Sequence, residues 1–242
     1  LRRSNCVILT DTDLFPPGTV SLNGLKIYGE ESGKVISYAA TMAHASQSGL
    51  SRLFDTLLEG EGGRLEPLDD LSFYEEGGVS GLIHGETVLF GTAAFCRKMH
   101  VTMPGGLSLK TGAFLAVDGT LIAIFAVKYT AAENVDWALH ALKRSRITPV
   151  LAVRDGSITP ALLKRKFGTD ARAVYPTIST RLALSEKDGE HPYALLYREG
   201  LMPYAEIAVG SKRLVHAVRV AAVLSLGSSA VSALLAFYLT FV

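Results

Sequence analysis

The chain has 242 residues, which is enough for one large domain or for two smaller domains with an appended segment. Its formal net charge is +1, so the overall charge gives no indication of a surface for binding nucleic acid. Hydrophobic residues make up 48% of the sequence, a high share to which one C-terminal segment contributes much.

The first predicted element is a strand with two carboxylate side chains just after its C-terminal end. Residues 7–9 form an apolar run, and Asp11 and Asp13 follow it directly. Proteins of the α/β class place their ligands at this end of a strand. The turn residues 16–18 come next, and residues 20–28 alternate as a second strand would.

The middle of the chain predicts an antiparallel sheet flanked by helices. Residues 37–58 are rich in alanine and leucine and predict one or two helices. From residue 71 to residue 121, short apolar runs alternate with glycines. The pair Asp118-Gly119 between two such runs predicts a hairpin.

The following stretch alternates between helices and strands. Residues 133–144 predict an amphipathic helix and residues 160–167 another, whereas residues 149–153 and 171–175 predict short strands. This order implies a parallel sheet with crossover helices. Together with the opening strand, it predicts one α/β domain that a mixed domain interrupts.

The C-terminal segment predicts a membrane helix. Residues 220–242 carry no charge and are long enough, as a helix, to cross about 30 Å of hydrocarbon. The segment is preceded by the basic residues Lys212, Arg213, His216 and Arg219. By the positive-inside rule, we expect the globular domains before it to lie on the cytoplasmic side. We therefore expect a membrane location, with the lipid bilayer and other transmembrane helices as partners and with this sequence as a fragment of a larger protein.

Domain boundaries follow from these elements. The first strand of the α/β domain is expected in residues 1–20 and its remainder in residues 128–205. The inserted domain is expected in residues 21–127, and the juxtamembrane and transmembrane helix in residues 206–242. No set of metal ligands is predicted.

The order of these elements resembles the cytoplasmic half of a P-type ATPase, most closely the heavy-metal-transporting branch. The resemblance implies a fold in the α/β class, with a haloacid-dehalogenase-like Rossmannoid phosphorylation domain, an inserted α+β nucleotide-binding domain and a C-terminal transmembrane helix. It also implies ATP and Mg²⁺ as cofactors.

The phosphorylation signature of this family, Asp-Lys-Thr-Gly-Thr-Leu-Thr-x-Gly, can be aligned in two registers. Aligned on Thr12 and Gly18, it places Thr10 at the phosphorylated position, and a hydroxyl there cannot form an acyl phosphate. A shift by one makes Asp11 the nucleophile and Asp13 its partner acid. The first register is favoured because the apolar run then ends before Thr10, but the second stays open.

Other family motifs are partly retained. The glycine motif corresponds to residues 76–81, and the resemblance implies that Gly78, Gly81 and Gly85 bind nucleotide. The Ser-x-His-Pro motif corresponds to residues 46–49, where histidine and proline are both missing. The Thr-Gly-Asp motif keeps only its acid, Asp155, at the end of residues 153–155.

The charges that phosphoryl transfer needs are largely missing. The lysine that the family carries after the helix following Pro176 has no clear counterpart, Arg181 being the closest cation. Residues 193–203 lack the magnesium motif Gly-Asp-Gly-x-Asn-Asp. ATP and Mg²⁺ are therefore doubtful cofactors. The main hypothesis is a pseudo-ATPase with a regulatory or scaffolding role, and the catalytic positions are Thr10, Asp11 and Asp155. The alternatives are an active cation pump or phosphatase that uses Asp11, and a membrane-tethered interaction module that binds no nucleotide.

Overall fold

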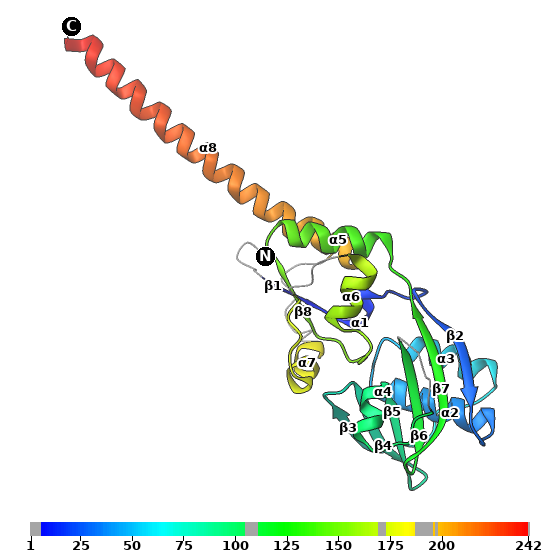
Figure 1. The fold of residues 1–242 in the computed structure, drawn as a ribbon. Coiled ribbons are helices and arrows are strands. Elements are labelled where there is room, and N and C mark those ends of the chain that lie inside the picture. Colours follow the sequence, from blue (N-terminus) through cyan, green and yellow to red (C-terminus); the bar gives the residue numbers. More distant parts are fainter. Residues whose placement is uncertain (1–5, 105–110, 169–172, 187–195, 197, 242) are drawn as a thin grey trace.

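The computed structural model describes residues 6–104, 111–168, 173–186, 196 and 198–241. These residues form a unit built around parallel strands, a unit built around an antiparallel sheet, and a long C-terminal helix (Figure 1). The fold is a mixed α/β arrangement.

The parallel unit is built around strands β1 (Cys6–Leu9) and β8 (Thr148–Leu151), which pair in register from Cys6 with Thr148 to Leu9 with Leu151. Val174 adds a single parallel bridge to Val150 on the other side of β8. The strand predicted over residues 171–175 is thus represented by this bridge, and residues 171–172 lie outside the described residues. The unit also contains α1 (Asp11–Leu14), α5 (Glu133–Arg144), α6 (Pro160–Phe167) and α7 (Ile178–Ser185).

The second unit, here called the sheet unit, is a six-stranded antiparallel sheet with three helices. Its strand order is β2-β7-β6-β5-β4-β3. The strands are β2 (Val20–Ile27), β3 (Asp69–Tyr74), β4 (Gly78–Ile83), β5 (Glu86–Gly91), β6 (Gly112–Val117) and β7 (Thr120–Tyr129), and the helices are α2 (Ser32–Ala45), α3 (Ser51–Gly60) and α4 (Ala93–Lys98).

Local chemistry explains several boundaries. Asp118 and Gly119 both adopt positive φ angles, 46° and 79°, between β6 and β7, so the predicted Asp-Gly hairpin is confirmed. The helices predicted over residues 133–144 and 160–167 are confirmed as α5 and α6. Residues 37–58 contain parts of two helices, and the strand predicted over residues 149–153 lies slightly earlier, at β8.

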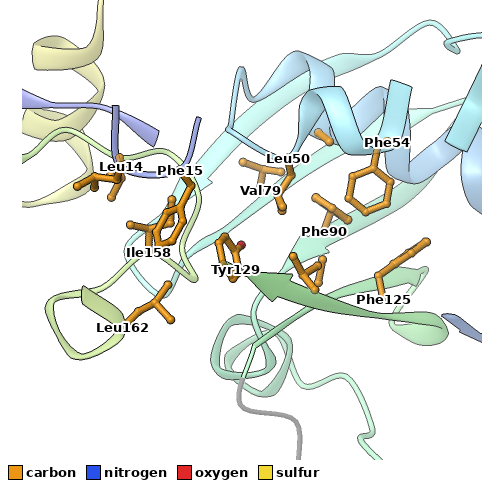
Figure 2. Close-up of a cluster of buried hydrophobic side chains, with 14 of the residues drawn as sticks. Leu14, Phe15, Leu50, Phe54, Val79, Phe90, Phe125, Tyr129, Ile158 and Leu162 are labelled. Atoms are coloured by element: carbon orange, nitrogen blue, oxygen red, sulfur yellow. The ribbon is translucent and has the colours of Figure 1, made fainter. Parts of the chain in front are cut away.

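A continuous hydrophobic core joins the two units (Figure 2). Phe15, directly after α1, packs against Tyr129 at the end of β7 with ring centroids 5.0 Å apart, and against Phe167 of α6 at 5.6 Å. Within the sheet unit, Phe54 packs edge-on against Phe90 and Phe125. The core therefore fixes the sheet unit against the end of β1.

Helix α8 (Leu201–Phe241) begins on the parallel unit and then leaves it (Figure 1). Its first turns bury Leu201, Ala205, Ala208 and Val209 beside α5. Beyond residue 215 its side chains are exposed through residue 241, although most of them are apolar. In the described part of the chain, α8 is the one helix long and apolar enough to cross a membrane. A long exposed apolar surface of this kind calls for a bilayer or a protein partner.

Candidate functional site

The parallel pairing of β1 and β8 brings two acidic residues of the sequence analysis together. Asp11 follows β1 after one residue and Asp155 follows β8 after three, so both lie at the C-terminal edge of the strands. The backbone N–H of Asp155 donates to Asp11 Oδ1 at 3.2 Å, and that of Arg154 donates to Asp11 Oδ2 at 3.2 Å. Each aspartate is only 5% exposed. They therefore form a buried acidic pair.

The sheet unit covers Asp11 directly. The backbone N–H of Gly49, in the loop between α2 and α3, donates to Asp11 Oδ2 at 3.2 Å. A Cβ atom added to Gly49 would lie 2.7 Å from the Cβ of Asp11, which is closer than real contacts allow. The position therefore requires a glycine, and its backbone occupies the space on that side of the carboxylate.

Burial shifts the protonation of both acids. Burial raises the pKa of Asp11 to about 7, and the neighbouring charge of Asp155 contributes to the same shift. The three backbone N–H donors lower this pKa, but their effect is smaller. Burial also raises the pKa of Asp155, although the Tyr129 hydroxyl and the Ser157 amide favour its charged form. Near neutral pH, Asp11 is therefore protonated in part of the molecules.

Tyr129 connects the end of β7 to this pair. Its hydroxyl donates a hydrogen bond to Asp155 Oδ2, and the backbone N–H of Ser157 donates to Oδ1 of the same carboxylate at 2.9 Å. The carboxylate oxygens of Asp155 thus each have a donor. Burial, followed by the charge of Asp155, raises the pKa of Tyr129, so this hydroxyl keeps its proton.

Thr10 has a different environment from Asp11. It directly follows β1 and precedes α1, and its hydroxyl donates to Asp13 Oδ2 at 2.7 Å. Its backbone N–H donates to the same oxygen at 2.8 Å, so Asp13 caps the start of α1. Thr10 and Asp11 both line a cavity of about 490 Å³, together with Gln47, Arg154 and Glu186 among others.

The two arginines near the acidic pair do not direct their charge at it. Arg154 donates through Nε to Ser185 Oγ at 2.8 Å and through a terminal nitrogen to the Ser46 carbonyl at 3.3 Å. Arg181 is fully buried, stacks on the Tyr175 ring and donates to the Tyr175 hydroxyl at 2.7 Å and to the Val153 carbonyl at 3.3 Å. Neither guanidinium has a described hydrogen bond to Asp11 or Asp155.

The glycines expected to bind nucleotide lie along β4 and its turn. Gly78 faces the Phe95 ring, where an added Cβ would lie 2.0 Å from a ring carbon, and Gly81 similarly faces the Leu68 side chain. Gly85 has a φ of 81° in the β4–β5 turn, where a left-handed conformation is needed. Only Gly78 of these three lines the small cavity between the units. Gly78 and Gly81 therefore allow the Phe95 ring and the Leu68 side chain to pack directly against the backbone of β4.

The space between the two units is nearly filled at the glycine motif, residues 76–81. A Cβ added to Gly77 would lie 2.5 Å from the Cα of Gly156, which follows Asp155. The cavity lined by Gly77, Gly78, Asp155 and Gly156 measures about 30 Å³. That volume is about the share of one water molecule in the liquid, whereas sites for drug-sized ligands span about 300 to 1,000 Å³. ATP does not fit at Gly78 in this arrangement, whereas the larger cavity beside Asp11 is lined by residues of both units.

A polar contact holds the β3–β4 turn against α7. Glu75 in this turn accepts a hydrogen bond from the backbone N–H of Ile178 at 2.6 Å, and its other oxygen lies 3.6 Å from a terminal nitrogen of Arg181. The site is thus bordered by four contacts between the units: Gly49 with Asp11, Gly77 with Gly156, Tyr129 with Asp155, and Glu75 with α7.

The acidic pair already uses part of its capacity to accept hydrogen bonds. The carboxylate oxygens of Asp11 and Asp155 all accept from N–H or O–H donors, which leaves fewer lone pairs for a magnesium ion. Across the described ranges, no group of three or more histidine, cysteine, aspartate or glutamate side chains is placed to hold a metal. Residues 193–195 and 197 of the segment expected to carry a magnesium motif lie outside the described residues.

Several contact residues at the site carry no recognisable signal in the sequence. Gly49, Tyr129 and Gly156 are brought to the acidic pair by pairing and packing over long sequence distances. The one local signal is Leu14-Phe15, which replaces the Gly-Thr of the family signature in the register that places Asp11 at the phosphorylated position. Both side chains are buried in the core between the units.

Comparisons with known proteins give structural neighbours only. No protein-family model matches the chain, and no curated protein matches it significantly. The N-domain of HMA8, a copper-transporting P-type ATPase, is 16% identical with a TM-score of 0.38, and the match covers 44% of this chain and 98% of that domain. The catalytic domain of the CPx-ATPase CopB-B is 14% identical with a TM-score of 0.44, covering 72% of this chain and 61% of that one.

A zinc-transporting PIB-type ATPase is 15% identical with a TM-score of 0.38. That match covers 71% of this chain and 29% of the transporter, so the chain spans under a third of that protein. The neighbours are thus N-domains and catalytic domains of copper- and zinc-transporting P-type ATPases, the branch that the sequence motifs resemble. At these identities and TM-scores, the likeness carries no argument about the chemistry of the site.

Proposed function

We propose that this chain is part of a P-type ATPase-like membrane protein of the cation-transporter family in which the phosphorylation site has become a contact between domains. In this proposal the parallel unit corresponds to a haloacid-dehalogenase-like phosphorylation domain and the sheet unit to its inserted domain. Helix α8 anchors both in a membrane, with the globular units on the cytoplasmic side. The protein acts as a regulatory or scaffolding pseudo-ATPase.

The environment of Asp11 carries this proposal. A carboxylate that attacks a phosphoryl group needs an open face for in-line approach and a cation that neutralises the developing charge. At Asp11, three backbone N–H groups, one of them from Gly49, already donate to the carboxylate, and the nearby guanidinium groups donate to other acceptors. The alternative acceptor, the Thr10 hydroxyl, donates to Asp13 and cannot form an acyl phosphate.

The narrow cavity at Gly78 favours the version of this proposal in which the chain binds no nucleotide. Calorimetric titration of the full chain with ATP, with and without Mg²⁺, tests it. We expect no saturable heat in either titration. Saturable binding that requires the sheet unit would contradict the closed arrangement and indicate a nucleotide-sensing pseudoenzyme.

A second candidate is an active phosphatase or pump that uses Asp11. It is favoured by the cavity of about 490 Å³ beside Thr10 and Asp11 and by the strongly raised pKa of Asp11, since shifted pKa values cluster at functional sites. Hydrolysis of p-nitrophenyl phosphate by the full chain would support it, provided that Asp11→Asn abolishes the activity. Hydrolysis that survives this substitution would exclude Asp11 as the nucleophile.

A further inference from the structure

The membrane-proximal end of the parallel unit carries basic side chains from two helices. Helix α5 ends beside the part of α8 that precedes its apolar segment (Figure 1). The Lys212 ammonium group on α8 donates to the Ser145 carbonyl, just after α5, at 3.2 Å. This contact fixes the end of α5 next to Lys212, eight residues before Val220, or about 12 Å along a helix with a rise of 1.5 Å per residue.

The charged side chains of this junction that come after Asp136 on α5 and after Glu206 on α8 are basic. The exposed residues at the end of α5 are Lys143, Arg144 and Arg146, and Arg213 and Arg219 are exposed on α8. The sequence contains no acid between Asp136 and Asp155 or after Glu206. Three acids, Glu133, Asp136 and Glu206, line the groove between α5 and α8, which Arg144 and Arg213 also line. We call the six cations the basic collar: Lys143, Arg144, Arg146, Lys212, Arg213 and Arg219.

Arg146 occupies a position that normally favours glycine. Its φ is 54°, in the left-handed region, and it follows the end of α5. Its N–H donates to the Lys143 carbonyl at 3.0 Å, and the N–H of Ile147 donates to the Leu142 carbonyl at 3.0 Å, which together form a Schellman motif. A glycine would adopt this conformation without strain. The arginine therefore adds a charge to the collar at the expense of local backbone stability.

We infer that the basic collar binds the anionic headgroups of the bilayer into which α8 inserts, and so holds the parallel unit against the membrane surface. This inference rests on the proposed membrane anchoring. Clusters of four to eight lysines and arginines next to a transmembrane helix attract anionic lipids, and the attraction acts over about one Debye length, roughly 10 Å. Three of the six collar residues come from α5 and the turn after it, so the interaction involves the folded unit as well as the residues flanking the membrane helix.

The test uses the full chain in nanodiscs of phosphatidylcholine alone or with added phosphatidylserine. Insertion is measured first, and hydrogen exchange of the amides in residues 143–148 is then compared between the two lipids. We expect exchange to slow about tenfold with the anionic lipid and to recover at high salt. Failure to insert would refute the proposed anchoring. Insertion with equal exchange in both lipids would overturn the collar alone.

Two sets of variants separate a lipid contact from a folding effect. The triple variant Lys143→Gln, Arg144→Gln, Arg146→Gln should lose the response to phosphatidylserine, whereas Arg52→Gln, Arg97→Gln, Arg165→Gln, which removes three charges elsewhere, should keep it. Arg146→Gly relieves the left-handed strain, so it should not lower the melting temperature but should weaken the lipid response. A full response in the triple variant, or slowed exchange with inorganic phosphate in phosphatidylcholine discs, would overturn the assignment to lipid.

Discussion

Asp11 makes the stability of the protein depend on pH. Its pKa is about 7 in the folded state against 3.8 as the ordinary value, so the folded state retains a proton that the unfolded state has lost between these values. The contribution of Asp11 to stability is therefore greatest at low pH and falls as the pH rises toward and through 7. From about pH 5 to about pH 8 this residue alone should lower the free energy of unfolding by roughly 2 to 3 kcal/mol.

Urea unfolding of the full chain in detergent, followed by the fluorescence of the single tryptophan, Trp137, measures this dependence. Asp11→Asn removes the ionisable group and should flatten the profile, although it disturbs the acceptors of three N–H groups. A wild-type profile no steeper than that of the variant would show that Asp11 is not a buried, proton-binding group.

Gly49 tests whether Asp11 is in contact with the sheet unit. In Gly49→Ala the new Cβ would lie 2.7 Å from the Cβ of Asp11, so the loop has to move away. We expect a loss of about 1 to 3 kcal/mol, the usual cost of overpacking. The matched control is Gly33→Ala in α2, where no atom lies within 4 Å of the new Cβ. Equal stability of the two variants in the same unfolding assay would argue against the contact.

At the scale of elements, the β3–β4 turn holds the sheet unit on α7 through Glu75. Glu75→Gln removes the charge facing Arg181, and because the glutamate side chain is 49% exposed, the direct loss should be about 1 kcal/mol or less. The larger effect should be faster hydrogen exchange in residues 74–78 and 173–185. Glu76→Gln is the control, since the Glu76 carboxylate pairs with Lys98 inside the sheet unit. If both variants exchange alike, Glu75 does not hold the two units together.

Local signals in the sequence predict elements far better than contacts between them. Helix α6 has a Thr159 cap, Pro160 at its start and Gly168 in a left-handed conformation after its end, and its predicted bounds are the observed ones. The predicted end of β8 lies two residues beyond the observed one, because residues 152–153 continue the apolar run, and the Ala152 N–H still donates to the Leu9 carbonyl at 2.8 Å. The approach of Asp11 to Asp155 follows from parallel pairing and could be predicted.

The closure of the site could not be predicted from such signals. It depends on contacts such as Gly49 with Asp11 and Gly77 with Gly156, which join residues 38 and 79 positions apart. In the sequence, Leu14-Phe15 is only a departure from the family signature. In the structure, the same two side chains fill the core that joins the units (Figure 2). A lost motif and a gained packing contact cannot be distinguished until the fold brings Tyr129 and Phe167 next to Phe15.

At the scale of the whole molecule, two compact units lie at one end of a 41-residue helix whose outer part is apolar and exposed. A hydrophobic core and four contacts bordering the acidic pair hold the units together. A protein that cycles ATP in a cleft between domains has to open and close that cleft during turnover. We therefore expect the two units to stay in contact at the acidic pair and to move as one body at the end of α8.

Phosphoenzyme formation tests the central claim, that Asp11 is a structural contact and not a phosphate acceptor. The full chain in nanodiscs would be incubated with radiolabelled ATP and Mg²⁺, quenched in acid and separated at acidic pH. We predict no hydroxylamine-sensitive label above that of Asp11→Asn. Label that hydroxylamine removes and that Asp11→Asn abolishes would contradict this claim and identify a working phosphorylation site.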